Sequence, residues 1–170
     1  MTGDIFKEQI VARKQTNKDL AIRICLVVVV ALVFLVTITI LNALGIIITI
    51  AVGFGAFYLM SFLRVEYEYI FTNGELDIDA IYNRSRRKRV FSAYVKNFEL
   101  MAHVEDMVHT GSFSSAQETR DYSSGDIKEN TYAFLINTSG KRLKVIIEPN
   151  EKMMDAISKA IPRSKLHLRR

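Results

Sequence analysis

The feature that most constrains this chain is a run without a charged residue from position 24 to position 63. Most residues in the run are Val, Ile, Leu, Phe or Ala. A single helix of this length would be roughly 60 Å long, about twice the hydrocarbon thickness of a bilayer. The turn-prone residues of 42–45 interrupt the run. It therefore predicts a transmembrane hairpin over 22–63, with spans near 22–41 and 45–63.

Two other interpretations of the run fit less well. A cleaved signal peptide follows a short basic leader, whereas the residues before this run form a long leader that carries acids. A buried helical hairpin of a soluble protein would need more covering chain than the remaining residues supply. The lone Cys25, at the start of the run, rules out a disulfide framework.

Lysine and arginine flank both ends of the predicted hairpin and are absent from its turn. Short flanks rich in these residues stay in the cytoplasm. We therefore expect both termini on the cytoplasmic side of the membrane, with the chain crossing twice. The flanking cations are Arg13, Lys14, Lys18, Arg23 and Arg64.

The densest charge in the chain is the sequence NRSRRKR at 83–89. Cations held close to an anionic leaflet gain on the order of 1 kcal/mol each. Nucleic-acid binding is not expected, because cations only slightly outnumber acids after the hairpin and no nucleic-acid motif accompanies them. The run predicts contact with anionic lipid headgroups or a protein partner, and a solvated charged turn remains the alternative. Its cations are Arg84, Arg86, Arg87, Lys88 and Arg89.

Small residues recur every four positions in the second predicted span, at Gly45, Thr49 and Gly53. This spacing lets helix backbones approach closely. We expect the seam to pack onto the first span; a seam to a second chain, in a homo-oligomer or a larger membrane complex, is the alternative. The uncharged run contains no acid, base or histidine, which argues against a channel, pump or transporter.

The segment 1–21 is polar and mixed in charge, and we expect it in the cytoplasm. Phe6 and Ile10 stand four residues apart, a spacing that suits a short amphipathic helix. Such a helix could lie in the membrane interface.

Beyond the second span, the hydrophobic period changes to two. VEYEYIF and ELDIDAIY flank Asn73-Gly74, the strongest short-range hairpin signal, so 65–82 is predicted to form a β-hairpin. A third strand is expected near 88–92, and a further apolar segment follows at 95–101. TYAFLIN and KRLKVIIE predict a second hairpin, with Ser139-Gly140 at its turn.

The chain between these hairpins, 102–130, loses periodicity and is rich in Ser, Asp, Glu and Gly. We expect a long loop, interrupted by a short strand near 106–113. After the second hairpin, PNEKMMDAISKAI predicts a helix that ends at Pro162, and 163–170 is a basic tail. Residues 64–162 are thus expected to form a cytoplasmic α+β domain, an antiparallel sheet or barrel closed by one C-terminal helix.

No residue constellation indicates catalysis. His103, Glu105 and His109 would share one face of a strand, but no further ligands accompany them, so we expect a solvated strand edge and no metal. Phosphate-cradling and zinc-protease motifs are absent from the sequence. The protein is therefore expected to be non-enzymatic and to carry no cofactor.

Three parts of the chain carry a family resemblance. YEYIFTNGEL, directly after the second span, and KVIIEPNEKMMDAISKAI resemble the bacterial PH-like domains beneath membrane hairpins, including the YcxB-like family. DIFKEQIVARK, VEYEYIFTNGELDID and EPNEKMMDAI are similar to an uncharacterised family of small two-span membrane proteins from Gram-positive bacteria. The resemblance implies a bacterial cell membrane protein with a small curved or barrel-like sheet capped by a helix. Such domains bind lipids, peptides or proteins rather than catalyse.

These observations lead to one hypothesis and one alternative. Two spans anchor a cytoplasmic PH-like domain that binds a protein partner or the anionic inner leaflet. In the alternative, the hairpin assembles the protein into a larger membrane complex, as an accessory subunit.

Overall fold

The computed structural model describes residues 5–138 and 140–167 of the chain. Its helices and strands are β1 Phe6–Ala12, α1 Asn17–Leu41, α2 Ala43–Ser61, β2 Val65–Thr72, β3 Glu75–Tyr82, β4 Arg86–Tyr94, β5 Leu100–His103, α3 Thr110–Ser114, β6 Glu118–Asp121, β7 Tyr132–Thr138, β8 Lys141–Ile147, α4 Glu151–Ala160 and β9 Leu166–His167. Short 3-10 turns occupy Val95–Asn97 and Arg163–Lys165.

Contacts divide the chain into two compact units. The hairpin unit consists of Gln15–Val65 with Tyr82–Arg86. The sheet unit combines the N-terminal segment that ends at Lys14 with Glu66–Ile81 and the chain from Arg87 onward. The N-terminal segment therefore belongs to the sheet unit rather than forming a region of its own.

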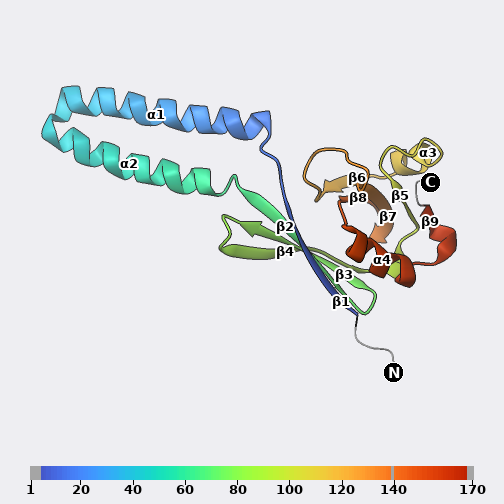
Figure 1. Ribbon diagram of the computed structural model, residues 1–170. Coiled ribbons are helices and arrows are strands. Elements are labelled where there is room, and N and C mark those ends of the chain that lie inside the picture. The colour runs from blue at the N-terminus through green and yellow to red at the C-terminus, as the bar shows by residue number, and fades with distance from the viewer. Residues whose placement is uncertain (1–4, 139, 168–170) are drawn as a thin grey trace. The chain divides into compact units, whose positions relative to one another are not determined.

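The helices α1 and α2 run side by side as a hairpin (Figure 1). Thr16 and Asp19 form a capping box at the start of α1, each side chain accepting a hydrogen bond from the other's backbone N–H. Asn42 alone joins the two helices, with φ at 48°, whereas residues 43–45, also expected in the turn, already belong to α2. Both helices are long and apolar enough to cross a membrane, by length and composition.

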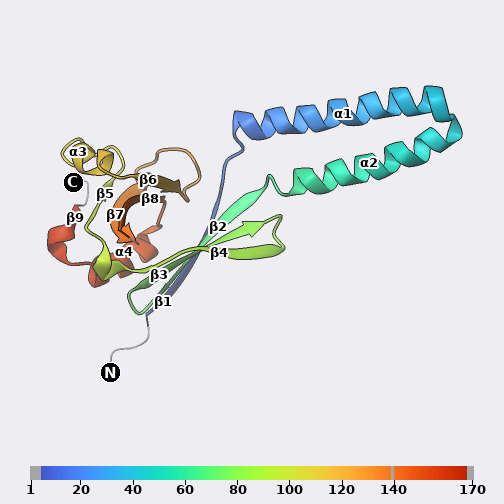
Figure 2. The same cartoon turned by 180° about the vertical axis from the view of Figure 1, so that it is seen from behind.

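The N-terminal segment contains a strand, so the amphipathic helix expected within 1–21 is wrong over β1. Strand β1 pairs antiparallel with β2, from Phe6 opposite Thr72 to Ala12 opposite Glu66 (Figure 2). Phe6 and Ile10, whose spacing suggested the helix, are both more than half exposed, whereas Val11 is buried. Because β1 precedes α1 and β2 follows α2, the helical hairpin is inserted between two adjacent strands of one sheet.

The first sheet has the strand order β1-β2-β3-β4. Asn73 and Gly74 join β2 to β3 with φ at 48° and 90°, the positive values that a type I′ turn requires. The predicted hairpin over 65–82 is therefore confirmed. The third strand, β4, is longer than expected and already begins at Arg86.

The second sheet has the strand order β6-β8-β7-β5-β9. Strands β7 and β8 pair antiparallel, as the second hairpin predicted, although Ser139 of the predicted turn lies outside the described residues. The outer strands pair in parallel, β6 with β8 and β9 with β5. The expectation of one purely antiparallel sheet is therefore wrong: the described chain forms two sheets, and the second is mixed.

The segment 102–130 is more structured than expected. Residues 106–113, predicted as a short strand, instead form a turn and the start of α3, in which Phe113 packs on a small buried cluster. Strand β6 also falls within the segment. All its residues are exposed, so it leaves no alternating hydrophobic pattern in the sequence.

The predicted C-terminal helix is present as α4. The Asn150 side chain accepts from the Met153 N–H at 2.8 Å and caps its start. Met153, Ala156 and Ile157 are buried in the same core cluster as residues of both sheets. The helix does not end the fold, because the expected tail 163–170 continues into β9.

Candidate functional site

The basic run occupies the turn from β3 to β4 and the first half of β4, so more of it is extended than the strand expected near 88–92 implied. Asn83 and Arg84 both have positive φ, and the Ser85 N–H donates to the Tyr82 carbonyl at 3.1 Å. From Arg86 onward, the chain is extended. Strand alternation therefore divides the cations of β4 between two faces.

One face is neutralised by carboxylates of neighbouring strands. Arg87 forms a two-pronged pair with Glu68 of β2, with both N–O distances at 2.9 Å. Arg89 bridges Asp77, at 2.5 Å, and Asp79 of β3. These two cations are committed to the sheet and cannot bind a ligand without leaving acids uncompensated.

The other cations point elsewhere. Arg86 and Lys88 are exposed and pair with no carboxylate of the described chain. Arg84 is exposed in the turn and takes part in an interaction of its own. Of the predicted lipid- or partner-contacting residues, Arg86 and Lys88 thus retain the most available charge.

Strand β4 is also the last strand of its sheet, and within residues 5–138 and 140–167 no strand pairs with its outer backbone edge. Native proteins protect such edges with charged side chains, because a bare edge pairs with other chains. Arg86 and Lys88 meet this structural need whether or not they bind a ligand.

Glu68 beneath Arg87 is an unusual acid, with only 1% of its surface exposed. Burial raises its pKa, a hydrogen bond with the Glu8 side chain raises it further, and Arg87 opposes both. The pKa of Glu68 is therefore raised above its ordinary value despite the ion pair.

The predicted small-residue seam packs chiefly inside the helical hairpin. A Cβ atom on Gly45 would lie 2.4 Å from the Thr37 backbone oxygen of α1, so only glycine fits there. The Thr49 hydroxyl lies 3.3 Å from the Thr37 hydroxyl. At Gly53, an added Cβ would only touch Val30, at 3.9 Å. The close approach of the two helices therefore depends chiefly on Gly45, the first residue of the seam.

His103 does not lie on the solvated edge expected of it. It is 2% exposed, its ring stands edge-on to Tyr132, and its Nε2 lies 2.9 Å from the Lys128 carbonyl oxygen. The sequence-based expectation is wrong for this residue, which is a satisfied core histidine.

His109 instead meets a residue that the sequence separates from it. Strand pairing of β5 with β9 places Ala102 opposite His167. The rings of His109 and His167 lie 4.1 Å apart between centroids, and His109 Nδ1 lies 3.0 Å from an Asp106 carboxylate oxygen. No cluster of three or more metal-ligating side chains occurs within the part of the chain that the structure describes.

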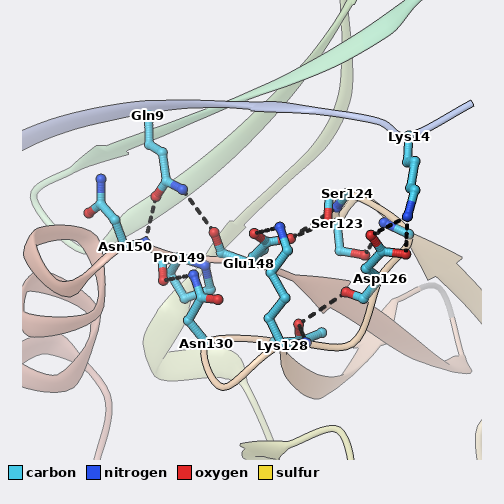
Figure 3. A network of polar contacts seen from close by, with 12 residues as sticks. Gln9, Lys14, Ser123, Ser124, Asp126, Lys128, Asn130, Glu148, Pro149 and Asn150 are labelled. Atoms are coloured by element: carbon cyan, nitrogen blue, oxygen red, sulfur yellow. Dashed lines mark hydrogen bonds and ion pairs between the residues drawn. The ribbon is translucent and has the colours of Figure 1, made fainter.

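A polar network converges on Glu148, at the end of β8 (Figure 3). Its carboxylate accepts from the Ser124 hydroxyl at 2.5 Å and from the Lys128 ammonium at 2.6 Å. Its backbone N–H donates to the Tyr69 hydroxyl at 3.1 Å, and that hydroxyl donates to the Tyr122 carbonyl at 2.6 Å. The network joins β2, β8 and the loop before β7.

Strand β1 is tied into the same network (Figure 3). The Gln9 amide donates to the Glu148 carbonyl at 2.8 Å and accepts from the Asn150 N–H at 2.7 Å. The Lys14 ammonium pairs with Asp126 at 2.9 Å. The strand that leads into the helical hairpin is therefore fixed to the loop and to the start of α4.

The electrostatics of the network follow from its donors. Burial raises the pKa of Glu148, but hydrogen bonds from Lys128 and Ser124 outweigh it, so the pKa lies below its ordinary value. Burial raises the pKa of Tyr69, which stays protonated and can donate. The arrangement holds a fixed charge, and its hydrogen bonds tie β1, β2 and the loop before β7 together.

Sequence reasoning missed both Glu148 and the His109–His167 contact. Glu148 had one signal, because it is a lone acid between the buried apolar end of β8 and Pro149. The histidine contact had none, since β9 is only two residues long.

The model of a family described as bacterial PH-like domain (DUF6106) matches residues 3–166. The match includes the helical hairpin as well as both sheets. Neither a curated protein nor a solved structure matches the chain significantly.

Proposed function

The chain belongs to the bacterial PH-like domain family, and on that premise we propose that it is a membrane-anchored binding module without catalytic activity. Helices α1 and α2 cross the membrane, and the PH-like sheet unit lies in the cytoplasm. There it binds the anionic inner leaflet through the exposed cations of β4. One observation carries the anchoring proposal: an apolar hairpin interrupts two strands that pair with each other.

The strand pairing supports a definite topology. Since β1 and β2 are hydrogen-bonded neighbours, the start of α1 and the end of α2 must lie on one side of a membrane. Two crossings satisfy this condition, whereas one crossing does not. The cations that flank both ends favour the cytoplasmic side.

Cysteine labelling tests this topology. In a Cys25→Ser background, Leu44→Cys places a thiol beside the turn, and Lys152→Cys places one on the exposed face of α4. A membrane-impermeant maleimide applied to intact cells should label only the Leu44 variant. In permeabilised cells, the maleimide should label both variants. Labelling of the Lys152 variant in intact cells would contradict the proposal.

The leaflet contact is supported by the division of the basic run. Arg86 and Lys88 are exposed, whereas Arg87 and Arg89 are held by acids of β2 and β3. Cations near an anionic surface contribute on the order of 1 kcal/mol each. Of the five candidate residues, Arg86 and Lys88 are therefore expected to make most of the contact with the leaflet.

Hydrogen exchange of the full chain in nanodiscs tests the contact. The β3–β4 turn should exchange more slowly in phosphatidylglycerol-containing discs than in pure phosphatidylcholine discs. The double variant Arg86→Gln/Lys88→Gln should abolish the difference. Lys141→Gln/Lys144→Gln on β8 is the matched control and should retain it. Equal exchange of the wild-type turn in both lipids would remove the leaflet role.

The accessory-subunit hypothesis remains a prediction, in which the hairpin assembles with another membrane protein. Gly45 and Thr49 are engaged with α1 inside the hairpin, which favours the interpretation that they pack within the chain.

A further inference from the structure

A large polar cavity lies beside the His109–His167 contact. Its volume is about 1120 Å³. Three segments far apart in the sequence form its wall: the turn before α3, the exposed side of α4 and the chain from Ile161 to His167. Its ionisable lining residues are Asp106, His109, Asp155, Lys159, Arg163 and His167.

The permanent charges of this lining nearly cancel. Asp155 pairs with Lys159 at 2.6 Å along α4. Asp106 is bound to His109. Arg163 is exposed and pairs with no carboxylate of residues 5–138 and 140–167, so its guanidinium is available to a ligand. With both histidines neutral, two acids balance two bases in the lining.

Protonation of the histidines changes that balance. An ionised Asp106 can only accept, so Nδ1 of His109 carries the hydrogen and Nε2 is left for another partner. No hydrogen bond to the His167 ring exists within the described chain, and this ring lies against that of His109. Two protonated rings in contact repel each other, and an anion between them and Arg163 would relieve that repulsion.

We propose that this cavity binds a tetrahedral dianion, such as phosphate or a phosphate monoester, through Arg163, His109 and His167. Arg163 supplies a planar fork that suits phosphoryl oxygens, and each imidazolium supplies one N–H donor. Binding favours the doubly protonated rings. By linkage, it tightens as pH falls.

The chain provides its own internal reference for the test. It has three histidines, and His103 is buried at Tyr132 rather than lining the cavity. We would label histidine with ¹³C and ¹⁵N, place the full chain in phosphatidylcholine nanodiscs, and follow the imidazole signals by NMR. Sulfate is the first probe because its charge is constant across the imidazole range, and phosphate is the second.

Sulfate should shift the signals of His109 and His167 and leave His103 unchanged. Its affinity should be roughly tenfold or more higher near pH 6 than near pH 7.5, because both imidazoles must be protonated. Arg163→Gln should remove the response. Lys152→Gln, on the same helix as Lys159 but outside the cavity, should preserve it. An unchanged His103 signal in the Arg163 variant shows that the variant is folded.

A second arm distinguishes a soluble anion from a lipid headgroup. Nanodiscs containing phosphatidic acid, whose headgroup is a phosphate monoester, replace the free probe. A response to free phosphate alone identifies a soluble ligand, and a response to phosphatidic acid alone identifies a headgroup. No response of His109 or His167 in either arm would overturn the proposal, as would an undiminished response in Arg163→Gln.

Discussion

Glu148 and Glu68 are both buried acids of the sheet unit, yet their pKa values move in opposite directions. Glu148 is 7% exposed and Glu68 is 1% exposed. Burial raises the pKa of both, but Lys128 and Ser124 reverse the effect at Glu148, whereas Glu8 reinforces it at Glu68. The hydrogen-bond donors around a buried carboxylate, rather than its depth of burial, decide whether its ionised form stabilises this fold.

The comparison also separates two kinds of polar region. Around Glu148, donors come from remote segments and fix β1, β2 and the loop before β7 to one another. Around Glu68, acids and arginines of neighbouring strands balance one another on one sheet. We expect the first region to govern stability, and the second to leave the remaining cations of β4 free for a surface.

The largest effect should follow removal of the Glu148 carboxylate. Glu148→Ala leaves the donors of Ser124 and Lys128 without their acceptor, and should lower the free energy of unfolding by about 3 kcal/mol. Urea unfolding followed by tyrosine fluorescence measures the loss. A loss of stability as small as that of Glu68→Gln would show that Glu148 contributes no more to the stability of the fold than Glu68 does.

Tyr69→Phe should have the next largest effect. The substitution leaves the Glu148 N–H and the Tyr122 carbonyl without their shared hydroxyl, at a cost of about 2 kcal/mol. Tyr132→Phe is the control, since Tyr132 is also buried at its ring but lies outside this network. The same urea experiment should show the control close to wild type.

The stability contributions of Glu148 and Glu68 should depend on pH with opposite signs. The pKa of Glu148 is lowered by folding, so its stabilising contribution is present above its unfolded pKa and is lost as pH falls through the folded value. The pKa of Glu68 is raised, so its ionised form costs stability at neutral pH, and that cost disappears as pH falls. As pH falls through the acid range, the free energy of unfolding should therefore decrease less steeply for Glu148→Gln, and more steeply for Glu68→Gln, than for wild type.

The smallest effect should follow Glu68→Gln itself at neutral pH. An amide retains a hydrogen-bond acceptor for Arg87 and removes a buried charge, so stability should stay within about 1 kcal/mol of wild type. A loss of stability as large as that of Glu148→Ala would show that the fold also depends on the ionised form of Glu68.

Local signals in the sequence predicted much of the fold. The uncharged run gave the helical hairpin, Asn73-Gly74 gave the first β-turn, and the apolar spacing before Pro162 gave α4. Strand β1 was mistaken for a helix because its exposed Phe6 and Ile10 mimic helical spacing, and its buried partner surface comes from a strand beyond the hairpin.

The candidate sites were less predictable, because they depend on pairings between distant residues. The sequence indicated a strand only near 88–92, and the acids that hold Arg87 and Arg89 are set by the strand order of the sheet. Likewise, His109 meets His167 only through the short β5–β9 pairing. No local pattern carries such information.

The helical hairpin is an insertion into a sheet that β1 completes. This insertion is tested by replacing 15–64 with a short flexible turn, which joins β1 directly to β2, and comparing the product with 65–170 alone. Thermal unfolding should show a soluble, cooperatively folded domain for the joined variant and a strongly destabilised one without β1, which lacks Val11 and the bonds of Gln9. Equal melting temperatures for the two variants would contradict the account.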